Sequence, residues 1–326
     1  MVFTYSRPIH THKVLEALNN NDLAHETDVY AYTCTPKNEG SAQGVEATQK
    51  VLYDFTEKSR FRSYTVVDIG KFLPLGPAMI NAVNETIKIN GKVIIVEDDI
   101  VTSKDFLSFM NACLDRYKDS KEIFSVGGYS PALKCFENMS EDVYFVRRAC
   151  PWGWATWSDR WERYDPVVRE YVKTMRNRKT RRSVSRWNTD LPMTLDALFY
   201  ERGCMDKNWE QQFCYSQYLN DMHVVCPKIS KVENIGFDGT GTHEAPEHLR
   251  SNFVPEGTEW ELCDPIMDKG FQDDYNRTFI FSFRNRMMLR LTNLVHFISP
   301  SLYYFIISKL YKNKPDLSEY LNGPSE

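Results

Sequence analysis

Three consecutive carboxylates, Glu97, Asp98 and Asp99, directly follow the apolar run Val93–Val96. The run has no polar alternation, which predicts a strand buried on both faces, as in the middle of a parallel sheet. Ligands of such sheets bind beyond the carboxyl ends of the strands. Acids packed together repel one another and raise their own pKa values unless a cation neutralises them. The junction therefore predicts a site for a divalent metal and phosphate.

The same acids have a second interpretation, as the end of a strand and the cap of a helix, because Asp and Glu are favoured at helix N-termini. One acid is explained in this way, but three are not. Thr102 or Ser103 is a better N-cap, with Asp105 in the first turn of the following helix. Acidic loops also bind calcium. The spacing favours the functional interpretation and leaves the structural one open.

A second group with chemical potential is a cluster of four tryptophans within ten residues, at positions 152, 154, 157 and 161, beside Gly153. Their spacing is neither helical nor strictly that of a strand. Aromatic rings pack against sugars in binding sites and against one another in cores, so both interpretations stay open. Further along, the glycine-rich loop 232–243 places a potential metal-binding imidazole, His243, near its end.

The composition of the 326-residue chain is that of an ordinary globular protein, with 42% hydrophobic and 26% charged residues. A net charge of −4 argues against a general nucleic-acid binder. The eight cysteines have no CxxC spacing, which indicates neither a zinc site nor a compact disulfide framework. Reduced thiols in a cytosolic protein are the expectation. No signal peptide is recognisable at the start, so the Asn-x-Ser/Thr sequons at Asn84, Asn138 and Asn276 do not indicate glycosylation.

The elements that position these residues alternate along the chain. Strands are expected at 2–5, 29–33, 63–67, 93–96, 123–126, 143–147 and 223–226, and helices at 11–18, 45–58, 76–90, 105–117 and 209–219. This alternation indicates βαβ units and an α/β fold with a mixed, mainly parallel sheet flanked by helices. Arg7 falls at the junction of the first strand and the first helix. The expected domains are 1–250 and a C-terminal helical extension, 251–326.

Two segments are strongly basic. Residues 169–186 predict a solvated helix face or a cover over an anionic ligand. Residues 275–315 contain no Asp or Glu, seven Lys or Arg, and many apolar side chains. The stretch 294–310 is too short for a transmembrane helix, and His296, Pro300 and several serines interrupt its apolar character. The basic and apolar interleaving predicts attraction to an anionic membrane surface, and the alternative is a helix packed on the core with its basic face in solvent.

Five ordered pieces of the sequence resemble one family: Tyr5–Pro8, Val93–Asp99 with Phe106 beyond it, Gly127–Tyr129, Arg147–Trp157 and Asn234–His243. Over about residues 2–248 they resemble nucleotide-sugar glycosyltransferases of the GT-A (Rossmann-like) fold, in particular bacterial sugar transferases related to animal N-acetylglucosaminyltransferase I. The resemblance implies a metal-dependent, inverting hexosyl- or N-acetylhexosaminyltransferase. Its donor would be a nucleoside diphosphate sugar such as a UDP-sugar. Its acceptor would be a glycan or lipid-linked glycan in the synthesis of surface polysaccharide, capsule or lipopolysaccharide.

The resemblance also implies roles for individual residues. Arg7 contacts the nucleotide, Asp99 ligates Mn²⁺ or Mg²⁺, and Glu97 and Asp98 face the donor sugar and ribose. His243 completes the metal site or contacts a phosphate, and a surface or capping histidine is the other interpretation. The sugar and acceptor pocket is assigned to Trp152, Gly153, Trp154 and Trp157.

The catalytic base is assigned to Glu210, because inversion requires a carboxylate that deprotonates the acceptor hydroxyl. Trp209-Glu210 stands where the animal family has a Trp-Asp pair at the start of a helix, and Asp206 is the reserve candidate. A solvated glutamate in the first helical turn is the other interpretation. Thr33-Cys34-Thr35-Pro36 stands where the family often has an acid beside the nucleobase, which leaves the nucleotide open.

Two other functions are compatible with the sequence. One is a catalytically silent, nucleotide- or carbohydrate-binding assembly protein of the same fold. The other is a metal-dependent phosphohydrolase, which lacks an identifiable nucleophile and leaves the tryptophans unexplained. The expected location is the cytoplasm, peripheral on the cytoplasmic face of the inner membrane.

Overall fold

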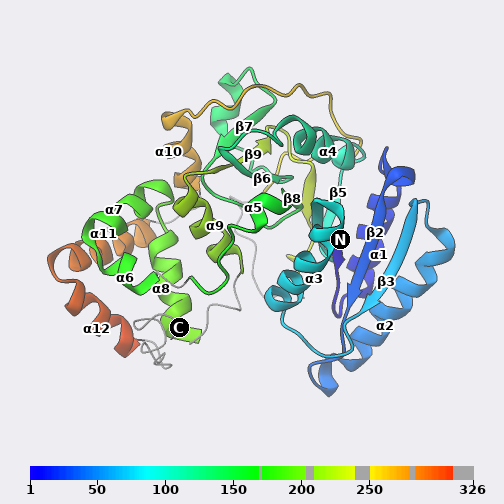
Figure 1. Ribbon diagram of the computed structural model, residues 1–326, viewed down its shortest axis with the longest axis horizontal. Coiled ribbons are helices and arrows are strands. Elements are labelled where there is room, and N and C mark those ends of the chain that lie inside the picture. The colour runs from blue at the N-terminus through cyan, green and yellow to red at the C-terminus, as the bar shows by residue number, and fades with distance from the viewer. Residues whose placement is uncertain (169–170, 203–208, 239–249, 279–282, 311–326) are drawn as a thin grey trace. The chain divides into compact units, whose positions relative to one another are not determined.

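The computed structural model describes residues 1–168, 171–202, 209–238, 250–278 and 283–310 (Figure 1). The chain divides into two compact units. The first comprises Met1–Val146, Cys150–Trp161 and Val224–Met267, and the second comprises Arg147–Ala149, Glu162–His223 and Asp268–Glu326. The predicted domain boundary at residue 250 stays a prediction.

The first unit is built on an eight-stranded sheet with the order β3-β2-β1-β4-β8-β6-β9-β7. Its strands are β1 (Val2–Phe3), β2 (Asp28–Thr33), β3 (Ser63–Asp68), β4 (Lys92–Glu97), β6 (Ile123–Gly127), β7 (Val143–Val146), β8 (Trp154–Trp157) and β9 (His223–Pro227). Strands β3, β2, β1 and β4 pair in parallel. Strand β8 is antiparallel to both β4 and β6, so β6 runs in the direction of β4. The predicted α/β class, with a mixed, mainly parallel sheet flanked by helices, is confirmed.

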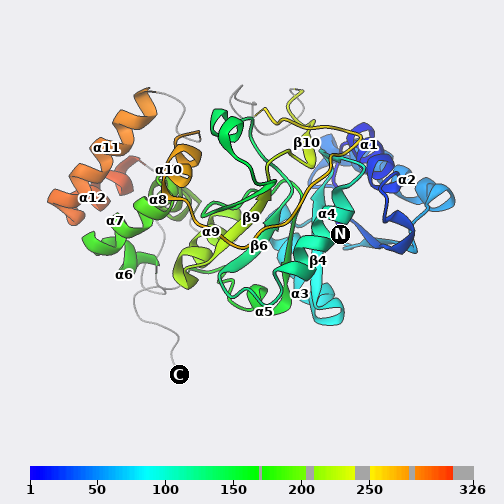
Figure 2. The same ribbon diagram turned by 90° about the horizontal axis from the view of Figure 1, so that it is seen from above.

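Helices lie on both faces of this sheet (Figure 2). They are α1 (Pro8–Asn19), α2 (Glu39–Phe55), α3 (Leu75–Asn90), α4 (Phe106–Arg116) and the short α5 (Ser158–Trp161), with 3₁₀ turns at Ala24–Glu26, Thr56–Lys58 and Lys134–Asn138. Local signals set their ends. Pro8 opens α1, where its fixed φ suits the first helical position. Asn38 and Ser41 form a capping box at α2, and Gly91, with φ 71°, ends α3 in the left-handed region.

A two-stranded antiparallel ribbon follows the acids. It consists of β5 (Ile100–Thr102) and β10 (Val232–Asn234), with Ile100 opposite Asn234. The predicted N-cap at Thr102 or Ser103 is wrong, since Asp105 precedes α4. The pairing with β10 keeps the chain extended through Thr102. The ribbon brings the loop after β10 next to the acids that precede β5.

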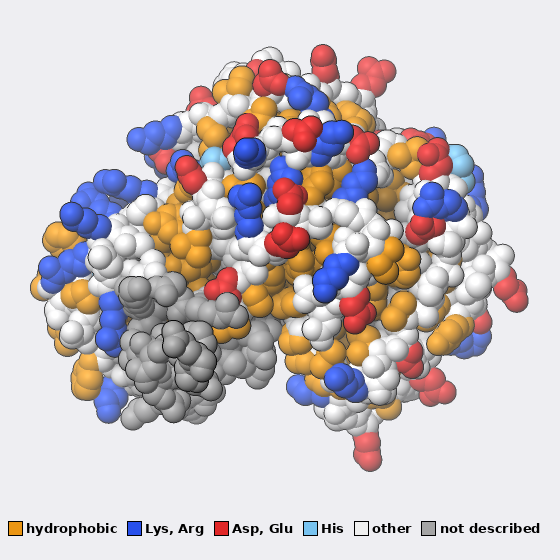
Figure 3. All heavy atoms as spheres, in the orientation of Figure 1, with side chains coloured by type: hydrophobic (Ala, Val, Ile, Leu, Met, Phe, Trp, Pro, Cys, Tyr) orange, Lys and Arg blue, Asp and Glu red, His pale blue; other side chains and the backbone are white. Residues whose placement is uncertain are grey.

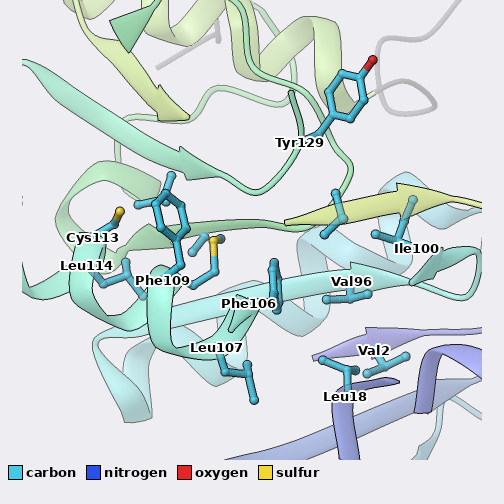
Figure 4. Close-up of a cluster of buried hydrophobic side chains, with 14 of the residues drawn as sticks. Val2, Leu18, Val96, Ile100, Phe106, Leu107, Phe109, Cys113, Leu114 and Tyr129 are labelled. Atoms are coloured by element: carbon cyan, nitrogen blue, oxygen red, sulfur yellow. The ribbon is translucent and has the colours of Figure 1, made fainter. Parts of the chain in front are cut away.

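The core of the first unit packs beneath the ribbon (Figure 4). Helix α4 contributes Phe106, Phe109, Met110 and Cys113, spaced so that all four side chains lie on one face and are buried. They join residues of the central strands, including Val2 and Val96. Full burial of one such apolar side chain contributes about 1.5–3 kcal/mol. The core therefore holds β1 and β4 rigidly beneath the residues at their carboxyl ends. The cysteines within the described ranges are free thiols.

The second unit is helical. Its helices are α6 (Tyr171–Arg176), α7 (Arg178–Trp187), α8 (Leu191–Arg202), α9 (Trp209–Asn220), α10 (Lys269–Thr278), α11 (Phe283–Ile298) and α12 (Pro300–Leu310). The basic segment thus forms α6 and α7, and the expected C-terminal helical extension is present as α10 to α12. None of the described helices is both long enough and apolar enough to cross a bilayer.

Candidate functional site

The carboxylates meet the turn after β1 at the end of the parallel strands. Glu97 is the last residue of β4 and lies opposite Phe3 of β1, so the two strands end at the same level. The backbone N–H of Tyr5 donates to Asp98 Oδ2 at 3.1 Å. The structure therefore brings together the two pieces of sequence at 5–8 and 93–99.

Arg7 and Asp99 form the central ion pair of the site. Arg7 Nη1 lies 2.8 Å from Asp99 Oδ2, and both side chains are largely buried. The other oxygen, Asp99 Oδ1, is buried and has no hydrogen-bond partner among the described residues. Buried carboxylate oxygens normally have a partner, so an unpartnered one points to a group beyond the described residues.

The described side chains are compatible with a hard cation that takes most of its oxygen ligands from a bound substrate. Among the described residues, no three His, Cys, Asp or Glu side chains converge as a complete metal cage. Magnesium-type sites commonly use one or two carboxylates and take further oxygens from substrate phosphates. Asp99 Oδ1 fits that requirement. His243, predicted as a further ligand, lies outside the described residues.

The loop after β10 closes against this pair. Ile235 N donates to the Asp99 carbonyl at 2.8 Å, and Gly236 N donates to Asn234 Oδ1 at 2.8 Å. A Cβ atom on Gly236 would lie 2.2 Å from Asp99 Oδ2 and 2.9 Å from Arg7 Nη1. No side chain fits there, so the glycine is required by the close approach of the loop to the ion pair.

His10 is a neighbour of the site that the sequence reasoning missed. Its Nε2 lies 3.2 Å from Asp238 Oδ2 and 3.3 Å from the Ile235 carbonyl. His10 stands one helical turn after Arg7, at the start of α1. That spacing was the available signal, because residues three apart on a helix lie on the same face.

Burial changes the protonation of one member of the acid cluster, Asp98. It raises the pKa of Asp98 to about 7, and the charge of Asp99 adds to the effect, while the Tyr5 N–H and Arg7 oppose it. The Asp98 carboxyl therefore exchanges its proton near neutral pH. A bound cation would favour its charged form and lower the pKa again.

A cavity of about 240 Å³ lies at the same edge of the sheet. Its wall includes Tyr5 and Phe72, whose ring centroids are 5.8 Å apart, together with Cys34, Glu97 and Asp98. Burial raises the pKa of the Cys34 thiol, which keeps it neutral. An aromatic and apolar wall with acids at one side suits a planar base with an attached sugar. Cys34 belongs to the predicted nucleobase segment 33–36, and it is the residue of that segment that lines the cavity.

The tryptophans divide between core and site. Trp154 and Trp157 lie in β8 and are buried, and Trp157 Nε1 donates to the Leu114 carbonyl at 2.9 Å. Their predicted place in a sugar pocket stays a prediction, which their burial disfavours. Trp152 is only partly buried, and its ring packs edge-on against Phe237 at 5.5 Å.

Gly153 allows the turn that separates these tryptophans. Its φ is 62°, and a Cβ atom there would lie 2.8 Å from Val232 Cγ1. The turn leaves Trp152 beside the loop that carries Gly236, while Trp154 enters the sheet. Trp152 thus contacts the loop that carries Gly236, through the ring of Phe237.

Glu210 belongs to the second unit, in the first turn of α9. Burial raises its pKa to about 7, with Arg148 opposing the shift and Asp190 adding to it. Arg148 is itself held by Asp190, with N–O distances of 2.5 and 3.2 Å. A carboxyl with this pKa can accept a proton at neutral pH. Asp206, the reserve candidate, lies outside the described residues.

Comparison with known proteins gives only weak likenesses. Neither a family model nor a curated protein matches the chain. The 1–349 fragment of S. aureus TarS is 11% identical, with a TM-score of 0.40, and the match covers 71% of this chain and 58% of that fragment. UDP-glucose pyrophosphorylase in complex with UDP-glucose is 12% identical, with a TM-score of 0.30 and coverage of 69% and 89%. The chain therefore spans less than two thirds of the TarS fragment. Likenesses this weak do not decide the function, and the relation to N-acetylglucosaminyltransferase I stays a prediction.

Proposed function

We propose that this protein is a metal-dependent, inverting glycosyltransferase that uses a nucleoside diphosphate sugar, with a UDP-sugar as the first candidate. The acceptor would be a hydroxyl of a glycan or lipid-linked glycan in surface polysaccharide or lipopolysaccharide synthesis. One observation carries the proposal. Asp99 uses one oxygen to pair with Arg7 at 2.8 Å, and its other oxygen is buried without a partner in the described structure.

The first unit would bind the donor. The nucleoside would occupy the cavity lined by Tyr5, Phe72 and Cys34. Arg7 would then meet the diphosphate, for which a guanidinium is the best-suited side chain. Asp99 would hold Mn²⁺ or Mg²⁺ through Oδ1. When bound, such a cation stabilises the negative charge of the departing diphosphate as a Lewis acid.

Glu210 would provide the base. As the acceptor oxygen forms its bond to the anomeric carbon, its proton passes to the Glu210 carboxylate. The bond between that carbon and the diphosphate oxygen breaks on the opposite face, and the nucleoside diphosphate leaves with the electron pair. The proposal for Glu210 rests on a pKa of about 7, which suits a base at neutral pH.

Calorimetric titration with nucleotide sugars tests donor binding, with Mn²⁺ present and with the metal removed by EDTA. We expect Mn²⁺-dependent binding of one nucleotide sugar, weakened at least about tenfold in Asp99→Asn, since loss of a metal ligand removes a charge-assisted contact. Asp54→Asn is the matched control, because Asp54 is an exposed acid on α2 that pairs with Lys50. Wild-type, metal-dependent binding by Asp99→Asn would overturn the proposal.

Turnover separates the rival functions. A transferase releases the nucleoside diphosphate faster when a lipid-linked or free glycan acceptor is added. A silent assembly protein binds the donor in the titration and releases nothing. A phosphohydrolase produces inorganic phosphate from simple phosphate esters, and Asp99→Asn would abolish that release.

A further inference from the structure

A cavity of about 400 Å³ in the second unit lies between α7 and α11. Three of the arginines that line it, Arg178, Arg182 and Arg186, recur every four residues on α7 and are exposed. This spacing places them along one face of the helix. None of the described lining residues is acidic, and Ser185 and Asn293 supply further polar groups. The cavity is therefore strongly positive.

Two buried side chains in its wall carry unpartnered nitrogen atoms. Arg181 is 3% exposed and pairs through Nη2 with Asp196 at 2.7 Å, whereas its Nε and Nη1 are buried without hydrogen-bond partners in the described structure. His296 is 2% exposed, and its Nε2 is likewise unpartnered. Burial and the neighbouring Arg181 lower the pKa of His296 to about 4, so the imidazole is neutral. Arg181 Nε and Nη1 are donors, and buried donors without acceptors are costly, which indicates that an acceptor beyond the described residues completes the wall at Arg181.

The helices beside the cavity expose apolar side chains in a regular stripe. On α11, Met287, Leu291, Leu294 and Ile298 are each more than half exposed. Their spacing of four, three and four residues follows one helical face. Among the described side chains of α11, Leu289 and His296 are buried and lie on other faces of the helix.

Helix α12 repeats the arrangement. Leu302, Phe305 and Ile306 are exposed, while Tyr303, Tyr304 and Ile307 are buried. A helix of a soluble unit normally turns its apolar stripe toward the core. Here one apolar face, with both tyrosines, is inside and a second apolar face is outside, and contiguous exposed apolar surface of this kind marks a protein or membrane contact.

The arginines and the apolar stripe adjoin one another. Arg178 Nη2 donates to the Ile298 carbonyl at 2.7 Å, and its guanidinium lies 5.9 Å from the centre of the Phe297 ring. Phe297 both lines the cavity and is exposed. Figure 3 shows Lys and Arg side chains gathered with hydrophobic ones over the region of α7, α11 and α12. Positive charge beside exposed aliphatic side chains is complementary to an anionic lipid surface, where phosphates lie above acyl chains.

We propose that α7, α11 and α12 form a docking surface for a bilayer that contains anionic phospholipid. The apolar stripes of α11 and α12 enter the boundary between head groups and acyl chains. Arg178, Arg182 and Arg186 bind lipid phosphates, and one head-group phosphate occupies the cavity against Arg181. The membrane prediction from residues 275–315 did not include these arginines of α7.

Vesicle flotation of the full chain tests the proposal, with neutral phosphatidylcholine vesicles and with vesicles that also contain phosphatidylglycerol. We expect binding only to the anionic vesicles, and a decrease with added salt. The double variant Arg182→Gln and Arg186→Gln should bind about fivefold more weakly for each arginine removed. Lys179→Gln is the matched control, because Lys179 is an exposed cation on the same helix outside the cavity lining.

The apolar stripe has its own variants. Leu291→Gln and Leu294→Gln should each weaken vesicle binding on the order of tenfold, because a leucine side chain no longer leaves water. Ile89→Gln, an exposed isoleucine on α3 of the first unit, should have no effect.

Three results would overturn the proposal: no binding of the wild type to anionic vesicles, equal binding to neutral vesicles, or wild-type binding by the arginine variants. A dimer in light scattering that the leucine variants dissociate, without vesicle binding, would assign the stripe to a second copy instead. A thermal shift by inorganic phosphate without vesicle binding would assign the cavity to a soluble anion. No assay includes donor or metal, so the outcome is independent of the proposed glycosyl transfer.

Discussion

Asp99 is held in place by two contacts within the protein, one to its side chain and one to its backbone. Its Oδ2 is fixed by Arg7, its carbonyl accepts from Ile235, and Oδ1 remains available. The carboxylate therefore has one orientation before any ligand arrives. Preorganisation of this kind lowers the cost of binding, because less side-chain freedom is lost. Arg7 thus positions the carboxylate that we propose as the metal ligand, in addition to carrying its own positive charge.

Gly236→Ala should disturb this arrangement from the other side of the ion pair. The new Cβ atom would lie 2.2 Å from Asp99 Oδ2, so the carboxylate or the loop must move. We expect a stability loss of about 1–3 kcal/mol, typical of overpacking, and loss of Mn²⁺-dependent nucleotide binding. Denaturant unfolding and calorimetric titration measure the two effects. Gly40→Ala is the control, because its Cβ meets only Asn38 Oδ1 at 3.5 Å, and equal binding by the two variants would contradict the expected role.

Glu210 should make the reaction depend on pH. Below a pKa of about 7 the carboxyl is protonated and cannot act as a base, so kcat should rise as the pH passes 7. Glu210→Gln should lower kcat by about 10²–10⁴-fold and remove this dependence. Initial rates between pH 5 and pH 9 are the measurement. An unchanged profile in Glu210→Gln would assign the base to another residue.

The same pKa predicts an effect on stability that needs no activity. The folded state raises the pKa of Glu210 from 4.5 to about 7, so it binds the proton more tightly than the unfolded chain does. The contribution to stability is full below about pH 4.5 and is lost as the pH rises to 7. The free energy of unfolding of wild type relative to Glu210→Gln should therefore fall across that window. Parallel curves for the two proteins would show that the glutamate is not buried in solution.

The residues of the candidate site were only partly predictable. Arg7 and the three acids could be placed at one edge because parallel strands end there together. His10 and Gly236 could not be assigned in the same way, since their importance comes from contacts between the start of α1 and the loop after β10, more than two hundred residues apart in sequence. The division of the tryptophans likewise depends on Gly153, whose φ of 62° directs neighbouring rings to different places.

At the scale of elements, helices α7, α8 and α12 are joined by one buried ion pair. Arg181 and Asp196 are 3% and 1% exposed, and Tyr303 donates to the same carboxylate at 2.5 Å. Asp196→Ala should cost about 3–5 kcal/mol, because it leaves a buried guanidinium without its counter-charge. Tyr303→Phe, which removes one hydroxyl, should cost about 1 kcal/mol. Urea unfolding compares them, and similar small losses in both variants would mean that water reaches Arg181.

Most elements could be predicted because their patterns are local. The expected strands and helices at 29–33, 63–67, 76–90, 123–126 and 209–219 agree with β2, β3, α3, β6 and α9 to within one or two residues. Strand β8 was missed, since Trp-Ala-Thr-Trp is short and buried on both faces and so shows no alternation. The β5–β10 ribbon was missed because each partner has three residues and they are distant in sequence. The same ribbon keeps the chain extended through Thr102, which is why the predicted N-cap at Thr102 or Ser103 was wrong.

At the scale of the whole molecule, the chain passes repeatedly between the two compact units. Residues 147–149 and 162–223 belong to the second unit, while 150–161 and 224–267 belong to the first. A single domain boundary, such as the one predicted at residue 250, cannot describe units interleaved in this way. Composition gave no signal for it, because both units contain ordinary amphipathic helices and the crossings have no linker-like segments rich in glycine or proline.

Each unit has its own core, so we expect urea to unfold the protein in two steps. Hydrogen exchange read by mass spectrometry assigns each step to its peptides. A nucleotide sugar with Mn²⁺ at 100 times its Kd should stabilise the first unit by about 2.7 kcal/mol, because only the folded state binds it. Asp196→Ala should lower the midpoint of the second unit alone. The contrary result is a single unfolding transition that ligand addition and Asp196→Ala shift equally. It would show that the two units unfold as one cooperative structure.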